Sequence, residues 1–554
     1  MKAYLKSVNQ FKIAMIIILC FSVFINSYSM GWGLPSFNAW AADELIPSRV
    51  IDGIEKGFSN GWHFKYPPFH FYVLTILYSP ILLLHNLKLV DVNSLPTYTI
   101  LFYIGRFTSV IMGAGLVFVT YLCGRELYEE RAAVFAASIA ASLCPFVYYA
   151  KTMNLEVPYL FWVMVSMLFY IRILKHQKLA DYLLFSATAA IAVGTKDQAY
   201  GLYILTPIFI IYQNYLYLKQ NNQNARLKDA IMDEKVILAF VLGFTIFLTI
   251  HNIVFNLQGF IKHVNLITAG DAQIRPRFER NIFGYFSMFV QSFRHIRFAF
   301  GWPLYCLCML GLFSGFLNKK KSYLLLCLLI PIVSYYLFYI SVVFYNNVRY
   351  LLPSCLILAL FGGQFIAELL NPAKQFFKAK AVLMTGIFVY TFAYAFSVNV
   401  LMENDSRYYV EKWMEQNISK NEVVLGAGDR KYLPRLENYK SEITRKPTLA
   451  VLAKTKPDYI IGTSGYDIRR FETNRPEYEF FDKLNRGELG YKLLFTYKSH
   501  PKWDLFNQEE LGYRDIDQMY IYSNFDKINP EIRVFRKMRV DEWREMSCSS
   551  LNNI

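Results

Sequence analysis

The sequence has few charged residues for its length. They make up 18% of the 554 residues, whereas hydrophobic residues make up 55%. The apolar residues are also unevenly spread, because they gather in blocks of roughly 18–25 residues, the length of helix that crosses about 30 Å of hydrocarbon. A soluble chain of several globular domains is therefore excluded, and the pattern predicts a polytopic α-helical membrane protein.

The sequence also lacks the motifs of several enzyme classes. It contains no P-loop, no dinucleotide-binding fingerprint and no GxSxG nucleophile elbow. Its eight cysteines form no CxxC pair, and most lie in apolar segments, which favours packing over metal binding. The net charge of +16 lies largely in short links between apolar blocks, where it sets membrane topology, so nucleic acid is not an expected partner.

About twelve apolar blocks can be recognised. The first, near residues 12–30, follows several lysines and has no clear cleavage site, so we interpret it as a retained anchor with its N-terminus inside. The others lie near residues 69–87, 97–123, 132–150, 153–174, 180–196, 199–218, 235–256, 299–317, 322–343, 350–370 and 381–399.

The distribution of positive charge predicts which blocks cross the membrane. If the block 69–87 lies at the outer interface, the inside loops carry most of the lysines and arginines, as cytoplasmic loops do. That block follows Tyr66-Pro67-Pro68, as an interfacial helix could. The sequence therefore predicts about eleven spanning helices plus interfacial helices. The basic stretch 257–298 is expected as a long outer loop, which either closes over a substrate or binds anionic lipid headgroups.

The chain changes character near residue 401, where charge rises and short apolar runs alternate with amphipathic stretches. We therefore expect a transmembrane domain over residues 1–400 and a soluble extracytoplasmic domain over residues 401–554. The pattern predicts helices near 408–416, 447–454 and 478–484, and strands near 422–425, 459–461, 492–497, 519–522 and 532–535. This alternation indicates a small α/β domain.

Ionisable residues gather on the predicted outer face, although such residues are costly near a membrane and are often functional there. They are Asp43, Glu44, His63, Lys65, Arg106, Glu156, Lys196, Asp197 and Arg349. A carboxylate can take a proton from an acceptor hydroxyl, and cations can neutralise charge on a leaving phosphate. The set therefore suits the transfer of a group from a phosphate-linked lipid.

Six short motifs carry a more specific resemblance. They are Asn38-Ala39-Trp40-Ala41-Ala42-Asp43-Glu44, Lys65-Tyr66-Pro67-Pro68, Gly105-Arg106-Phe107-Thr108-Ser109, Asn154-Leu155-Glu156-Val157-Pro158, Gly194-Thr195-Lys196 and Val348-Arg349-Tyr350-Leu351-Leu352-Pro353. In this order they resemble the superfamily of protein O-mannosyltransferases and lipid A aminoarabinose transferases, glycosyltransferases of the GT-C fold in family 39. The resemblance spans residues 35–370, and it departs from the family pattern at Glu156, where aspartate is usual.

The resemblance implies that Asp43 is the general base and that Glu44 is the second catalytic acid. Each residue has an alternative. Asp43 could be a solvated loop acid or the N-cap of a short helix, and Glu44 could pair with Arg106 instead of acting on substrate.

The resemblance also implies a set of substrate-binding residues, in which cations contact the donor phosphate. They are Lys65, Arg106, Glu156, Lys196 and Arg349. For Lys65, Lys196 and Arg349 the alternative is anchoring at the membrane interface. Glu156 is also a candidate metal ligand, so a divalent metal is the one cofactor considered.

These expectations describe an inverting membrane glycosyltransferase. It would move a sugar from a polyprenyl-phosphate donor to a lipid, glycan or protein acceptor outside the plasma or inner membrane. Two other functions remain open. A transporter predicts inverted repeats and polar residues near mid-bilayer, which we do not find in the sequence. A non-catalytic membrane scaffold would tolerate loss of Asp43.

Overall fold

The computed structural model describes residues 2–55, 65–268, 278–317, 322–373, 375–506 and 524–539. The chain forms two compact units. The first comprises Met1–Met30 and Glu44–Val398, and the second comprises Gly31–Asp43 and Asn399–Ile554. The expected division near residue 400 therefore lies close to the observed one. No sequence pattern indicated, however, that residues 31–43 belong with the C-terminal part of the chain.

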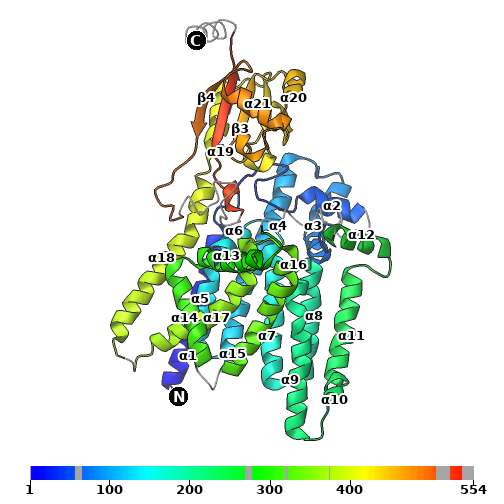
Figure 1. Cartoon of the computed structure of the whole chain (residues 1–554), viewed down its shortest axis with the longest axis vertical. Helices are drawn as coiled ribbons and strands as arrows, with labels where there is room; N and C mark the ends of the chain where they lie inside the picture. The colour runs from blue at the N-terminus through cyan, green and yellow to red at the C-terminus, as the bar shows by residue number, and fades with distance from the viewer. Residues whose placement is uncertain are drawn as a thin grey trace. The chain divides into compact units, whose positions relative to one another are not determined.

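The described residues of the first unit form helices joined by turns and short irregular segments. Its helices are α1 (Lys2–Ser27), α2 (Pro47–Glu55), α3 (Phe69–Asn86), α4 (Leu95–Leu127), α5 (Glu130–Ala141), α6 (Cys144–Tyr149), α7 (Glu156–His176), α8 (Leu179–Thr195), α9 (Leu205–Asn221), α10 (Leu227–Ile231), α11 (Glu234–Ile250), α12 (Leu257–Thr268), α13 (Ile282–Phe300), α14 (Trp302–Leu317), α15 (Ser322–Tyr335), α16 (Ser341–Val343), α17 (Leu352–Leu369) and α18 (Phe377–Glu403), the last of which ends in the second unit. Figure 1 shows α8 running beside α7 and α11, with α13 lying across their direction.

Seven helical stretches of the described residues are long and apolar enough to cross a membrane, or eight if the bent pair α13–α14 is one span. Several of the predicted spans correspond to helices that are too short for this test. They are α5 with 12 residues and α8, α9 and α11 with 17 each. The apolar block 132–150 is divided into α5 and α6 because Pro145 opens a new helix instead of continuing the old one.

The helix α3 matches the block 69–87 closely. It is long and apolar enough to cross a membrane, so its place at the outer interface stays a prediction. The stretch 257–298, expected as a loop, carries α12 and α13 instead. In α13 the apolar side chains Ile282, Phe283 and Phe286 are exposed while Ser292 and His295 are buried, a distribution typical of a helix that presents an apolar face to lipid.

The second unit is built on a five-stranded mixed sheet. The strands are β1 (Val423–Ala427), β2 (Lys440–Thr444), β3 (Tyr459–Thr463), β4 (Tyr491–Tyr497) and β5 (Ile532–Lys537), in the order β2-β1-β3-β5-β4. The first three pair in parallel, and β5 is antiparallel to both of its neighbours. Figure 1 shows α19 (Ser406–Asn417) on one side of this sheet and α20 (Leu449–Thr455) and α21 (Pro476–Asn485) on the other.

Two apolar clusters fix these layers. Val410 and Met414 of α19 pack on one face of the sheet, and Phe480 and Leu484 of α21 pack on the other. All three predicted helices and four of the predicted strands are present, so the α/β prediction is confirmed. Strand 519–522 lies outside the described residues. The sequence did not reveal β2, whose residues are mostly polar and partly exposed at the edge of the sheet.

Candidate active site

Three segments of the first unit bring one carboxylate and two cations together. Glu156 is the first residue of α7, and its backbone N–H donates to Asn154 Oδ1 at 3.0 Å. Lys196 directly follows α8 in an extended conformation. Arg349 lies in the 3₁₀ turn Val348–Leu351 that leads into α17, where its backbone N–H donates to Asn347 Oδ1 at 3.1 Å. Each ionisable side chain therefore stands at a helix end whose backbone is held locally.

Glu156 is the centre of this cluster. Its Oε1 contacts Lys196 Nζ and lies 3.3 Å from Arg349 Nε, while its Oε2 accepts from Gln198 Nε2 at 3.3 Å. The carboxylate is fully buried, whereas the two cationic side chains are each 12% exposed. Both cations are therefore oriented by one carboxylate, and the cluster carries one more positive charge than negative.

A tyrosine ring lies against each of the two cations. The Lys196 ammonium lies 5.5 Å from the centroid of the Tyr159 ring, and the Arg349 guanidinium lies 5.3 Å from that of Tyr350. Tyr339 packs edge-on against Tyr350 at 5.3 Å between centroids and donates to Gln198 Oε1 at 3.3 Å. Such cation–π contacts stabilise each charge where water is scarce.

A second ion pair is almost completely buried. Arg106 donates from Nε to Glu44 Oε1 at 2.7 Å and from Nη2 to Glu44 Oε2 at 2.9 Å. The backbone N–H of Met153 adds a bond to Oε1 at 2.7 Å, and Arg106 Nη1 donates to the carbonyl of Met30 at 2.6 Å. Both oxygen atoms of Glu44 are therefore occupied. The alternative in which Glu44 pairs with Arg106 is what the structure shows.

Asp43 is the last residue of the N-terminal segment that belongs to the second unit. Its backbone is left-handed, with φ of 54°, and its side chain is half-buried. Aspartate is one of the few residues that adopt this conformation readily. The next helix, α2, begins only at Pro47, so the alternative in which Asp43 caps a short helix is wrong.

The contact described for Lys65 is with an aromatic ring. Lys65 is exposed just before α3, and its ammonium lies 5.1 Å from the ring centroid of Tyr66. Its role in substrate binding stays a prediction. His63 lies outside the described residues.

Sequence reasoning missed several members of the Glu156 cluster. Gln198 and Tyr159 are ordinary residues in an apolar sequence, and only their closeness in sequence to Lys196 and Glu156 could have suggested them. Asp197 was noted as a charge, but its partner was not foreseen. Its Oδ1 lies 2.9 Å from His263 Nε2, which ties α12 to the turn after α8.

The donor set around Glu156 does not fit a divalent metal. Its carboxylate faces an ammonium and a guanidinium, which would repel a metal cation. Magnesium and calcium require several oxygen ligands instead. Within the part of the chain that the structure describes, no group of three or more His, Cys, Asp or Glu side chains could hold a metal ion.

Comparisons with known proteins give a partial match. Residues 102–251 match the sequence model of a family described as dolichyl-phosphate-mannose-protein mannosyltransferase. No curated protein matches the chain in sequence.

Among solved structures, the apo oligosaccharyltransferase of Archaeoglobus fulgidus has a TM-score of 0.49 at 10% identity, over 94% of this chain and 88% of that one. ArnT from Cupriavidus metallidurans bound to undecaprenyl phosphate has a TM-score of 0.46 at 12% identity, over 96% and 98% of the two chains.

The family match covers a well-defined part of the first unit. It begins in α4 and ends just after α11, and it includes Arg106, Glu156 and Lys196 of the six motifs. Over residues 102–251, the predicted resemblance to the protein mannosyltransferases is thereby confirmed.

Proposed function

We propose that this protein is an inverting membrane glycosyltransferase that uses a polyprenyl-phosphate sugar as donor. The observation that carries the proposal is the cluster in which Glu156 orients Lys196 and Arg349. The family matched by residues 102–251 supports it, because that family is described by its dolichyl-phosphate-mannose donor, a phosphate-linked polyprenyl sugar. The acceptor is a lipid, a glycan or a protein.

The charge of the cluster suits such a donor. A polyprenyl-phosphate sugar is a phosphodiester with one negative charge, and the cluster has one excess positive charge. When the sugar leaves, the phosphate becomes a monoester and its negative charge grows. Lys196 and Arg349 would stabilise that growing charge more strongly than they bind the ground state, which is the requirement for accelerating the reaction. Arg349 could hold two phosphate oxygens at once, while Lys196 acts as a point charge.

The reaction proposed is a single displacement at the anomeric carbon. The acceptor hydroxyl oxygen forms a bond to that carbon while the bond from the carbon to the phosphate oxygen breaks. The electron pair of the broken bond stays on the polyprenyl phosphate, and the hydroxyl proton passes to the carboxylate of Asp43. General-base help of this kind contributes about 10²–10⁴-fold to the rate. Glu44, whose oxygens are occupied by Arg106 and the Met153 N–H, would position the adjoining Asp43 rather than react.

The site is proposed to face the outside of the plasma or inner membrane. The distribution of lysine and arginine in the short loops supports this orientation. The same orientation places the second unit outside. A lipid-linked donor needs no soluble nucleotide, which agrees with the lack of nucleotide-binding motifs in the sequence.

The test is sugar transfer from a polyprenyl-phosphate donor by purified protein in nanodiscs. Asp43→Asn keeps the size of the side chain and tolerates the left-handed backbone, but it cannot take a proton. We expect normal insertion, a stability change within about 0.5 kcal/mol and a rate lower by about 10²–10⁴-fold.

Asp91→Asn is the matched control, since Asp91 lies in an exposed turn in which its Oδ1 accepts from the Asn93 N–H, and it should transfer at the parent rate. Transfer by Asp43→Asn at the parent rate would overturn the assignment of the base. A parent protein that transfers from no lipid-linked donor would instead favour the scaffold.

A further inference from the structure

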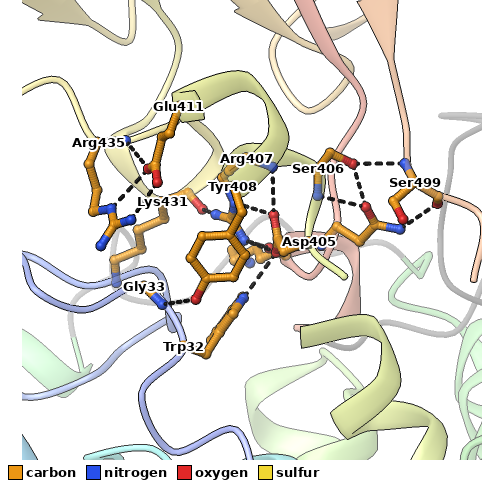
Figure 2. A network of polar contacts seen from close by, with 12 residues as sticks. Trp32, Gly33, Asp405, Ser406, Arg407, Tyr408, Glu411, Lys431, Arg435 and Ser499 are labelled. Atoms are coloured by element: carbon orange, nitrogen blue, oxygen red, sulfur yellow. Dashed lines mark hydrogen bonds and ion pairs between the residues drawn. The ribbon is translucent and has the colours of Figure 1, made fainter. Parts of the chain in front are cut away.

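We propose that the C-terminal unit positions the general base, because a buried ion pair on α19 clamps the loop 31–43 that ends in Asp43. The proposal rests on the proposed function, in which Asp43 is the base. It assigns a positioning role to Asp405 and Arg407, which no sequence motif indicated. Figure 2 shows the contacts of Asp405 with Trp32 and Arg407 and that of Gly33 with Tyr408.

Asp405 is the hub of the clamp. It caps α19, and its Oδ1 accepts from Arg407 Nε at 2.8 Å and from the Arg407 backbone N–H at 3.0 Å. Its Oδ2 accepts from Arg407 Nη2 at 2.6 Å, from the indole Nε1 of Trp32 at 3.0 Å and from the backbone N–H of Asn529 at 2.9 Å. One carboxylate thus joins three segments that are far apart in the chain, and one of them is the loop.

Arg407 continues the clamp on its other side. Its guanidinium carbon lies 3.9 Å from the ring centroid of Trp40 and 5.2 Å from that of Trp32. Its remaining donors reach the carbonyls of Lys431 and Lys527 at 2.5 and 2.8 Å. The side chain is completely buried, so its charge is balanced by Asp405 and its planar face is available for the two indoles.

Further contacts fix the tip of the loop. The backbone N–H of Gly33 donates to Tyr408 Oη at 3.1 Å, and Ser36 Oγ donates to Glu437 Oε1 at 2.9 Å. Gly33 itself has φ of 73°, and a Cβ atom at this position would lie 2.9 Å from the Trp40 ring. Only glycine allows this backbone and this close approach. Contacts at several positions therefore fix the conformation of the loop.

The clamp is more elaborate than packing requires. A buried ion pair is commonly no more stabilising than well-packed apolar residues, and its best-attested use is to specify one arrangement. Here the arrangement specified is that of Trp32 and Trp40. Asp43 follows Trp40 by three residues, and the residue after it, Glu44, is fixed by Arg106. The segment that leads into Asp43 is therefore held in one conformation, as a general base requires, because a displacement of about 1 Å can cost 10²-fold in rate.

The experiment uses the full chain in nanodiscs and measures the loop and the reaction separately. Ala41 is fully buried, so a cysteine placed there reports release of the loop through its reaction with a maleimide, quantified at that position by peptide mass spectrometry. In Arg407→Met we expect labelling at position 41 to accelerate by about tenfold or more, kcat to fall by about 10²-fold, and the Kd for the polyprenyl phosphate to stay unchanged. Arg407→Lys keeps the charge, so its labelling rate and its kcat should lie between those of the parent and those of Arg407→Met.

The matched control is Arg475→Met, because Arg475 forms an exposed ion pair with Glu472 on the same unit; it should change neither readout. If Arg407→Met does not accumulate, Tyr408→Phe combined with Ser36→Ala is measured in the same way, since these changes leave no buried charge unpaired. Labelling that stays slow would overturn the clamp, and fast labelling with parent kcat would overturn the positioning role. The labelling needs no sugar transfer, so a failure of the proposed function is recognised separately, by a parent that has no activity.

Discussion

At the scale of single residues, the cluster in the first unit depends on Glu156. Its two oxygens are shared among Lys196, Arg349 and Gln198, and the carboxylate has no exposure to water. Removal of its charge would leave two cations beside each other with no carboxylate between them. The role of Glu156 is therefore to hold the cations, and its contribution can be measured apart from the base.

We expect Glu156→Gln to lower both stability and rate. Breaking a buried ion pair by removing one partner costs about 3–5 kcal/mol, and loss of a hydrogen bond to a charged group costs about 1.5–3 kcal/mol, which corresponds to roughly 10–100-fold in kcat/KM for the transfer reaction. Thermal unfolding and transfer kinetics measure the two effects. Unchanged transfer in this variant would remove Glu156 from the site.

Glu156→Asp and a chelator provide the control for this prediction. Aspartate keeps the charge and is one methylene shorter, so we expect it to retain much of the activity. Since the neighbours of Glu156 are cations, EDTA should leave the parent rate unchanged. Inhibition by EDTA that added magnesium or manganese reverses would show that a metal acts in the reaction and contradict the role given to Glu156.

The residues of the site were partly predictable. Membrane-boundary charges and short motifs indicated Glu156, Lys196 and Arg349, because ionisable residues are rare enough in such a sequence to be noticed. Tyr159 and Gln198 could not be predicted, since tyrosine and glutamine carry no signal among so many neutral residues. Their roles follow from the packing of α7 against the segment after α8, which no local pattern encodes.

At the scale of elements, the sharpest feature is the corner between α13 and α14. The two helices meet at 119°, and Gly301 between them has φ of 72° and ψ of 160°. This region of backbone space is accessible almost only to glycine. The turn lets α13 lie across the bundle while α14 runs along it (Figure 1).

We expect Gly301→Ala to destabilise the protein by about 1–3 kcal/mol. The cause is backbone strain alone, because a Cβ at this position meets nothing closer than 3.5 Å. Gly386→Ala in α18 is the matched control, since its Cβ meets nothing within 4 Å and its backbone is helical; alanine there should be neutral or stabilising by up to about 1 kcal/mol. Thermal unfolding in one detergent compares them. Equal unfolding temperatures of the Gly301→Ala and Gly386→Ala variants would show that a side chain at position 301 does not strain the corner.

Elements with a strong local pattern were well predicted, and those shaped by their neighbours were not. The strands β1 and β3 lie inside the sheet and are apolar, so the sequence revealed them, whereas β2 exists because it pairs with β1 at an edge. The apolar run 132–150 has the composition of one spanning helix, but it breaks before Pro145. The length of an apolar run indicates whether it could cross a membrane. Its composition does not show where a helix within it is interrupted.

At the scale of the whole molecule, the division into two units could be placed from composition near residue 400. That residues 31–43 belong to the second unit could not be predicted from composition. Their placement there depends on contacts such as Trp32 with Asp405, which are separated by 373 residues in the chain. Such pairings are invisible to any reading of local sequence. The motif that resembles a catalytic loop, residues 38–44, therefore belongs to the C-terminal unit in all but its last residue, Glu44.

The orientation of the chain in the membrane is the prediction on which the proposed site depends. Short loops that carry several lysines or arginines are expected inside, together with the adjoining helix ends, and Lys378 lies in the first turn of α18. Lys454 at the end of α20 reports on the second unit, and both side chains are exposed. In intact cells, an impermeant maleimide should label Lys454→Cys and leave Lys378→Cys unlabelled, with the label at each position quantified by peptide mass spectrometry.

Permeabilised cells serve as the control. Both positions should react in them, because both side chains are exposed and the two positions are expected to differ only in the side of the membrane on which they lie. If Lys378→Cys reacts in intact cells and Lys454→Cys does not, the whole chain is inverted. The cluster of Glu156 would then be assigned to the cytoplasmic face, and the acceptor would have to be sought there. Transfer assays in nanodiscs expose both faces and would stay unchanged, so only the labelling of intact cells decides on which side the sugar is transferred.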